Sequence, residues 1–222
     1  MISVGDQFAC AITVAKGLKC WGANFGNLGD GTRADRNIPV DVFGLTNGVT
    51  RVATGARHAC VLTLAGGVKC WGENDRGQLG DGTTTLRSLP VDVQGLSSGV
   101  VAIAAGGFDT CAVINNGGIK CWGANDLGQV GNGGVTDRLV PTDVIALGGT
   151  ALSVAVSGHA ACALMSAGGV KCWSREYPFN SVIPRDMPGL SSGVTDISAG
   201  GLHFCVIATP GNMGCFGPNN QF

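Results

Sequence analysis

The chain has 222 residues and a net charge of −1, with 45% hydrophobic and only 13% charged residues. This composition excludes an intrinsically disordered chain, which requires high charge and low hydrophobicity. Because acidic and basic residues are balanced and scattered, a nucleic-acid partner or a membrane-surface role has no electrostatic support. No apolar run approaches the roughly 18 residues of a transmembrane helix, so membrane insertion is not expected.

One sequence pattern recurs along the whole chain. Its best copy is CVLTLAGGVKCWGENDRGQLGDGT at residues 60–83, and related copies begin at Cys10, Cys111, Cys162 and Cys205. The first cysteines of successive copies are 50, 51, 51 and 43 residues apart, which indicates a repeat architecture. We therefore expect a single repeat array over residues 1–222. Its units are about 1–49, 50–100, 101–151, 152–194 and 195–222, the last one incomplete.

The sequence of each unit predicts four short antiparallel strands. The first ends in small residues, as in VATG at 52–55, and the fourth carries proline, as in LPVDV at 89–93. The second and third are joined by a Gly-rich turn such as 65–67, where glycine supplies the positive φ of a hairpin. No stretch has the 3.6-residue apolar period of a helix. Four strands in each unit of about 50 residues predict an all-β fold, a β-propeller of about five four-stranded blades.

Strand direction predicts which loops share a face. If the first strand of a unit runs up, the loop after it lies at the top, and so does the loop after the third strand. This end of the molecule is called the top face below. The small residues of the first strand suit the innermost position, where neighbouring blades crowd around an axis.

The ten cysteines form five pairs, each with nine intervening residues. A central turn places the two members nearly opposite each other on adjacent strands, with Cβ atoms about 4.5–5.5 Å apart, which favours a disulfide inside each blade. Metal binding by paired thiolates, for which two to four intervening residues are typical, and reduced, packed thiols are the alternatives. The pairs are Cys10–Cys20, Cys60–Cys70, Cys111–Cys121, Cys162–Cys172 and Cys205–Cys215.

A disulfide framework requires an oxidising compartment. Met1 is followed almost at once by repeat sequence, which leaves no room for a signal peptide. Both observations agree if the chain is a mature, excised or truncated piece of an exported protein, located outside the cell or at its surface.

Two motifs resemble a known family. Residues 52–60, VATGARHAC, and 71–80, WGENDRGQLG, resemble the regulator of chromosome condensation repeat, and the resemblance covers nearly the whole chain. The cysteine-paired version looks like the exported bacterial branch called alpha-tubulin-suppressor-like. The resemblance implies a propeller usually of seven blades, so that five units would be a fragment of one. It also implies an interaction platform, since members include a nuclear exchange factor for a small GTPase and a secreted inhibitor of β-lactamase.

The chain departs from the family pattern at several points. The family histidine is present as His58 and His203, but its position holds Phe8, Asp109 and Ala160 in the other units. The fourth unit lacks the GQLGDG loop, and the fifth stops before its own. Nothing in the sequence supports transfer of GTPase exchange activity.

Other recurring residues have structural interpretations. One aromatic residue per unit is expected to pack between blades rather than to bind a ligand: Trp21, Trp71, Trp122, Trp173 and Phe216. One lysine in each of the first four units is expected to extend its ammonium group into solvent rather than to form a ring: Lys19, Lys69, Lys120 and Lys171. The three histidines lie on different units, so no metal site is predicted. We expect neither a catalytic residue nor a cofactor, and hence no enzyme.

The residue three positions before each first cysteine changes its chemistry in every unit, while its neighbours repeat. Loops after the third strand add further side chains to the same top face. Mixed arginine, aromatic and aliphatic side chains on a rigid scaffold predict a protein-binding surface, the alternative being loop variation that nothing selects. The predicted site residues are Gln7, Arg57, Phe108, His159 and Leu202, with Phe25, Arg76 and Leu127.

The sequence thus predicts a non-enzymatic protein-binding module of an exported or cell-surface protein, with a protein or surface ligand as its partner. A second hypothesis is a structural subunit that self-associates through its incomplete last blade, because an unpaired strand edge templates pairing with another chain.

Overall fold

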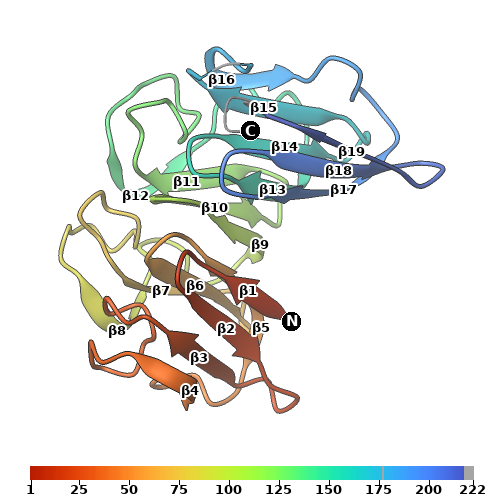
Figure 1. Ribbon diagram of the computed structural model, residues 1–222. Helices are drawn as coiled ribbons and strands as arrows, with labels where there is room; N and C mark the ends of the chain where they lie inside the picture. The colour runs from red at the N-terminus through yellow and green to blue at the C-terminus, as the bar shows by residue number, and fades with distance from the viewer. Residues whose placement is uncertain (177, 218–222) are drawn as a thin grey trace.

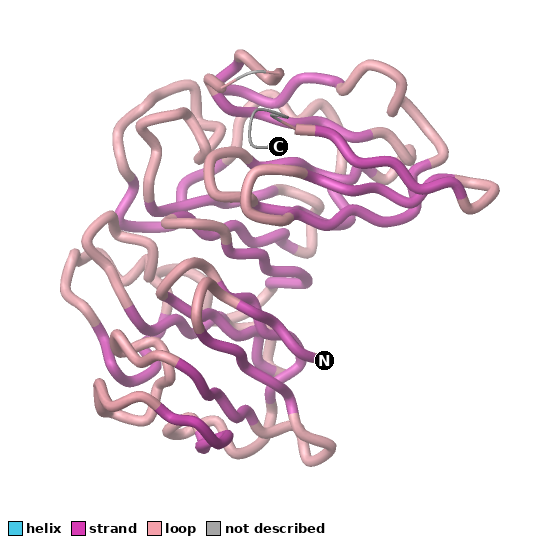
Figure 2. Tube along the Cα trace, in the orientation of Figure 1, coloured by secondary structure: helices cyan, strands magenta, loops and turns pink. Residues whose placement is uncertain are grey.

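The structure is a computed structural model in which residues 1–176 and 178–217 are described (Figure 1). These residues form strands, turns and loops, without a helix (Figure 2). No helix able to cross a membrane therefore occurs in this part of the chain. The strands form five separate antiparallel sheets, which are the blades of a β-propeller, so the predicted fold class is confirmed.

Each blade is a meander in which consecutive strands pair from the axis outward. Blade 1 comprises β1 (Ile2–Val4), β2 (Phe8–Ile12), β3 (Leu18–Gly22) and β4 (Arg36–Asp41). Blade 2 comprises β5 (Val49–Thr54), β6 (His58–Thr63), β7 (Val68–Gly72) and β8 (Arg87–Asp92). Blade 3 comprises β9 (Val100–Ala105), β10 (Asp109–Ile114), β11 (Ile119–Gly123) and β12 (Arg138–Asp143). Blade 4 comprises β13 (Ala151–Val156), β14 (Ala161–Met165), β15 (Val170–Ser174) and β16 (Ser181–Asp186). Blade 5 comprises β17 (Val194–Ala199), β18 (Phe204–Ala208) and β19 (Asn212–Phe216).

The first strand of each blade is innermost, as the sequence predicts. Strands β1, β5, β9, β13 and β17 pack against one another in succession and line a central opening. Small residues such as Ala53, Ala104 and Ala155 allow the strands to approach there. In Figure 1 the blades fan out from this opening, with β1 near one end of the succession and β17 near the other.

The second and third strands of every blade pair in a register that places the two cysteines opposite each other. Cys60 faces Cys70 in blade 2, and the other four blades repeat this register. All five pairs are bonded, which confirms the predicted disulfide in each blade and rules out paired thiolates or reduced thiols. In the chain-entropy model a crosslink that closes so short a loop stabilises the fold by about 2–3 kcal/mol at best.

Neighbouring blades pack through two unlike faces. One face of a blade carries its disulfide and is called the disulfide face; the other carries its tryptophan and is called the Trp face. Trp71, fully buried on blade 2, packs against the disulfide face of blade 1 and donates its indole N–H to the carbonyl oxygen of Asn27 at 2.9 Å. The same hydrogen bond recurs from Trp122 to Gln78 and from Trp173 to Gln129. The predicted packing role of the tryptophans is therefore confirmed for these three blades.

The two terminal blades each leave one of these faces uncovered. Val4, on the Trp face of blade 1, is 68% exposed, whereas its counterpart Thr54 is 8% exposed beneath blade 1. Trp21 is only half-buried for the same reason. On blade 5, Met213 of β19 is 76% exposed, and within the described residues this blade has three strands. That the last unit is incomplete stays a prediction, because residues 218–222 lie outside the described part of the chain.

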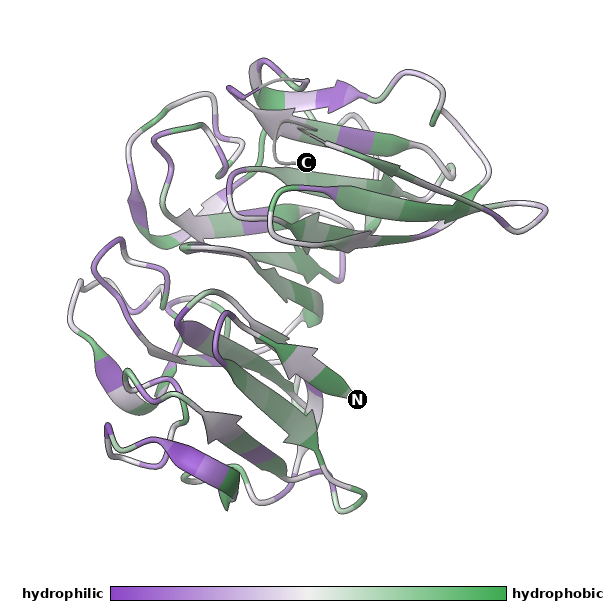
Figure 3. Ribbon diagram, viewed as in Figure 1, coloured by the Kyte–Doolittle hydropathy of each residue, from purple (hydrophilic) through white to green (hydrophobic). Residues whose placement is uncertain are grey.

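Ion pairs join the third and fourth strands of the first four blades. In each of the first four blades a lysine of the third strand forms an ion pair of 2.6–2.7 Å with an aspartate of the fourth. Figure 3 shows hydrophilic segments on outer strands such as β4 and β16, while the inner strands are largely hydrophobic. Exposed pairs of this kind are worth about 0–1 kcal/mol each. Each of the four lysines is thus paired with an aspartate of its own blade.

Replacing Trp71 by Phe should destabilise the protein, because the change removes the indole N–H bond to Asn27 and leaves that buried carbonyl without its donor. We expect a loss of about 1–3 kcal/mol in the free energy of unfolding, measured by urea denaturation. Trp21→Phe is the matched control, since no preceding blade covers that side chain. Equal losses for the two variants would contradict the proposed asymmetry of the faces.

Candidate functional site

The loops between the first and second strands of all five blades meet at the top face. They comprise residues 5–7, 55–57, 106–108, 157–160 and 200–203. Main-chain hydrogen bonds join them in series, from Asp6 N to Ala56 O, Ala56 N to Gly106 O, Gly107 N to Ser157 O and Gly158 N to Gly201 O. A side chain at Gly55 would collide with the Gly106 carbonyl, so glycine is required for this approach. The five residues predicted from these loops therefore stand on one rigid arc.

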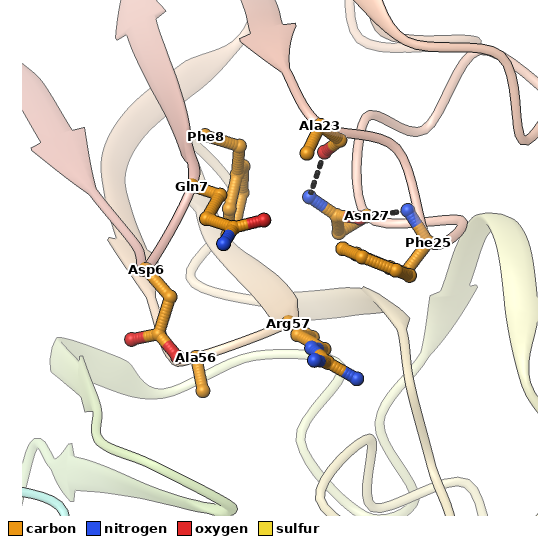
Figure 4. A pocket seen from close by; sticks show the side chains of 8 residues that line it. All are labelled: Asp6, Gln7, Phe8, Ala23, Phe25, Asn27, Ala56 and Arg57. Atoms are coloured by element: carbon orange, nitrogen blue, oxygen red, sulfur yellow. Dashed lines mark hydrogen bonds between the residues drawn. The ribbon is translucent and has the colours of Figure 1, made fainter.

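Three predicted residues line one groove between blades 1 and 2. Gln7 and Phe25 come from blade 1, and Arg57 comes from the top loop of blade 2 (Figure 4). This small hollow adjoins a larger one of about 560 Å³, with which it shares Gln7 and Phe25. Glu73 and Leu86 of blade 2 line the far side of the larger hollow. The structure thus brings together residues that the sequence separates by up to 79 positions.

Phe25 is held by the polar loop that carries it. Its main-chain N–H donates to Asn27 Oδ1 at 2.6 Å, and Gly26 N–H donates to Asn24 Oδ1 at 2.9 Å. Both asparagines are almost fully buried, and Asn24 Nδ2 also donates to the carbonyl of Ala34. The loop consequently presents the Phe25 ring, which is 41% exposed, in a fixed orientation.

The Arg57 guanidinium lies over the Phe25 ring, with its central carbon 4.3 Å from the ring centre. The Arg57 side chain is 47% exposed, and its nearest carboxylate oxygen belongs to Glu73, 3.8 Å away. The second Glu73 oxygen is buried without a hydrogen-bond partner. Burial first, and then the charge of Asp75, raises the pKa of Glu73. The Arg57 guanidinium on the Phe25 ring and the incompletely bonded Glu73 carboxylate can therefore still form hydrogen bonds with a polar ligand.

Glu73 was not among the predicted site residues. A signal for it exists in the sequence, because Trp-Gly-x-Asn has alanine as its third residue in blades 1 and 3 but Glu73 in blade 2. A charged residue where other copies have a small one indicates a role specific to that blade.

Arg76 occupies a different environment from Arg57. Its guanidinium hydrogen-bonds to Asp137 of blade 3, with NH2 3.0 Å from Oδ1, and lies 3.2 Å from Asp126. The hydrogen bond to Asp137 raises the pKa of Arg76 further above its usual range. Arg76 therefore links the loops of two blades, and a ligand would have to compete with Asp137 for it. Its predicted part in binding stays a prediction.

The remaining predicted residues lie farther along the arc. Phe108 and His159 line a hollow of about 440 Å³ at the mouth of the central opening. His159 Nδ1 lies 3.1 Å from a carboxylate oxygen of Glu176. Leu127 and Leu202 are half-buried. Binding by these four residues stays a prediction as well. In the described ranges, 1–176 and 178–217, no cluster of three or more metal-binding side chains occurs.

Two of the five residues at the position of the family histidine, His58 and Asp109, are buried ionisable groups beneath this face. His58 is fully buried, and its Nε2 lies 2.9 Å from the Thr110 hydroxyl of the next blade. Burial lowers the pKa of His58 to about 4, so the ring is neutral at pH 7. Asp109 is also fully buried, and neither of its carboxylate oxygens has a partner. Burial, followed by the charge of Asp126, raises the pKa of Asp109 well above its usual value.

Sequence comparison decides the family. The profile of the regulator of chromosome condensation (RCC1) repeat matches residues 20–62, 65–113 and 116–164, which is more than half of the chain. The chain belongs to the RCC1 repeat family. It is 31% identical over 211 residues to the ultraviolet-B receptor UVR8 of Arabidopsis thaliana, a match that covers 90% of this chain and 48% of UVR8. This RCC1-repeat chain therefore spans about half the length of that relative.

Solved structures share the fold. Human WBSCR16 superposes with a TM-score of 0.84 at 25% identity, over 98% of this chain and 61% of that one. Yeast RCC1 (Prp20), solved in complex with Kap60, superposes with a TM-score of 0.80 at 20% identity, over 98% and 55% of the two chains. These proteins are human and yeast, and UVR8 is from a plant, so the assignment to a bacterial, cysteine-paired branch stays a prediction.

Asp109→Asn should stabilise the protein at neutral pH. The folded-state pKa of Asp109 is raised above its unfolded value, so this carboxyl destabilises the fold increasingly as the pH rises from about 4 toward that folded-state pKa. The amide does not titrate, and the gain in unfolding free energy over wild type should therefore grow between pH 4 and pH 7, measured by urea denaturation. Asp6→Asn, at an exposed position, serves as the control. A gain that is independent of pH would contradict a buried, protonated Asp109.

Proposed function

We propose that this RCC1-repeat chain is a non-enzymatic protein-binding module that engages its partner through the top face. The observation that carries the proposal is the groove between blades 1 and 2. There, an arginine, an aromatic ring and an amide that differ from their counterparts in the other blades lie side by side. Arginine and aromatic residues on a rigid scaffold are the usual centre of a protein-binding surface. Yeast RCC1, which has the same fold, was solved bound to Kap60, so a protein partner is known for one protein of this fold.

We also propose that the protein works in an oxidising compartment, exported from the cell or at its surface. Five disulfides, with no free cysteine in the described part of the chain, support this location. The groove side chains include no nucleophile with an adjacent base, and many of the residues that line the mouth of the opening are glycines. The site therefore favours recognition over chemistry.

The double variant Arg57→Ala, Phe108→Ala should lose partner binding and keep its thermal stability, because both side chains are partly exposed on the top face. With the immobilised full chain as bait, proteins retained from an extracellular fraction are quantified by mass spectrometry. We expect the affinity for a top-face partner to fall by at least about tenfold. Leu64→Ser, in an exposed turn at the opposite end of blade 2, is the control. A partner retained equally by the double variant would contradict the face assignment.

A second function is favoured by blade 5. Its outermost described strand, β19, pairs only with β18, and Met213 on it is exposed. Such an edge can pair with a strand of another chain, so the protein would act as an assembly subunit that associates with itself.

Assembly predicts a mass above 22.4 kDa in size-exclusion chromatography with light scattering. Met213→Lys should return the mass to that of a monomer, because a charged side chain on an edge strand opposes pairing. Leu64→Lys, away from this edge, should leave the mass unchanged. A monodisperse wild-type monomer at high concentration would eliminate the assembly function and leave the top-face proposal intact.

A further inference from the structure

Arg57 differs from three other arginines at this end of the molecule, Arg36, Arg76 and Arg87. Arg36 and Arg87 donate to Asp30 and Asp81 at 2.8 and 2.9 Å, and Arg76 donates to Asp137. Among the described residues Arg57 has no hydrogen-bond acceptor, and the 3.8 Å to Glu73 exceeds hydrogen-bond length. The fold supplies a carboxylate to each of these three arginines but none at hydrogen-bond distance to Arg57.

We propose that the Arg57 groove binds an extended peptide segment of the partner, in which a carboxylate side chain stands next to an apolar one. This inference rests on the top-face function proposed above and specifies its ligand. The carboxylate would accept two hydrogen bonds from the Arg57 fork, the strongest geometry available to an arginine. Because Phe25 already fixes the guanidinium plane, little side-chain freedom is lost on binding.

The apolar part of the groove lies next to the arginine. Leu86, which precedes β8 of blade 2, lies beside Gly26 of blade 1 and shares the 560 Å³ hollow with Phe25. An aliphatic side chain of a bound peptide can rest on this pair while its neighbour reaches Arg57. The hollow is large enough for one or two side chains and too small for a folded domain, so a peptide segment is the unit that it accommodates.

The charges around the groove favour a carboxylate over a phosphate. Two cations, Arg33 and Arg57, face three acidic side chains: Asp6, Asp35 and Glu73. Each unit of negative charge on the ligand is repelled by these acidic groups, and the repulsion grows in proportion to the ligand charge. A phosphate group, which itself carries close to two negative charges, therefore meets roughly twice the repulsion that a carboxylate meets. The same argument disfavours nucleic acid.

Glu73 competes with the ligand for Arg57. It lies close enough to attract the guanidinium without saturating it, and it would repel an incoming carboxylate. Removing its charge should therefore strengthen binding, whereas a purely structural role would weaken it. Asp75 beside Glu73, and Asp6, Asp35 and Arg33 around the groove, are the other charges that act on the bound group.

Random displayed peptides are first selected for binding to the full chain. Peptides that also bind the Arg57→Gln variant are removed by counter-selection. The best Arg57-dependent peptide is then labelled and measured by fluorescence anisotropy, together with its Glu→Gln (or Asp→Asn) and phosphoserine versions. We expect the amide version and the Arg57→Gln protein each to reduce affinity by about tenfold or more, and Arg57→Lys by a smaller factor. Glu73→Gln should tighten binding by about two- to fivefold. Thermal unfolding of each variant confirms that the fold is intact.

Several results would overturn the inference: no Arg57-dependent peptide, equal binding of the acidic and amide peptides, or preference for phosphoserine. If partner capture still depends on Arg57 and Phe108 while peptides show no acidic preference, the top-face function stands and this ligand class is wrong. If partner capture is also unaffected by the double variant, both fail.

Discussion

The packing of a Trp face on a disulfide face is the contact on which the rest of this structure depends. At three successive interfaces a buried indole fills the space beside the preceding cystine and donates its N–H to a main-chain carbonyl. That carbonyl belongs to the loop after the third strand, the same loop that carries Phe25 in blade 1. The interface that stabilises the array therefore also fixes the loop that forms one side of the groove. Stability and site geometry have a common source.

Repetition explains how much of this could be predicted. A period of about 50 residues, small residues at the end of each first strand and evenly spaced cysteines each occur several times, so blades, innermost strands and disulfides follow from the sequence. The contacts that distinguish one blade from the next occur once and leave no such signal. Strand direction predicts that Arg57 and Phe25 share a face, but their stacking depends on how two blades are offset. The same holds for Arg76, whose partner Asp137 lies 61 residues away.

The buried polar positions show the energetic cost of varying a repeat. His58 has a hydroxyl opposite it, Thr110, which in turn donates to the carbonyl of Gln78. One blade later, Asp109 takes the place of the histidine and Ala161 takes the place of the threonine, so the carboxyl has no side-chain partner. Burial then lowers the pKa of the base and raises that of the acid. In both cases burial favours the uncharged form, because an ionised group inside an interface loses its hydration without gaining an oppositely charged partner.

The same comparison of copies separates structural from binding arginines. Arg36 and Arg87 occupy equivalent places in two blades, and each has an aspartate in its own loop, so their charges hold the loops in shape. Arg57 has no counterpart of the same chemistry in any other blade, and its position is not needed to close a loop. It is nevertheless held in place, because the ring of Phe25 supports it from a loop braced by Asn24 and Asn27. Holding the Arg57 side chain in one orientation lowers its conformational entropy, and no hydrogen bond within the described residues offsets this loss. A hydrogen-bond acceptor on a bound ligand would offset this loss, and a ligand that reaches Arg57 would lie beside the apolar surface of the groove.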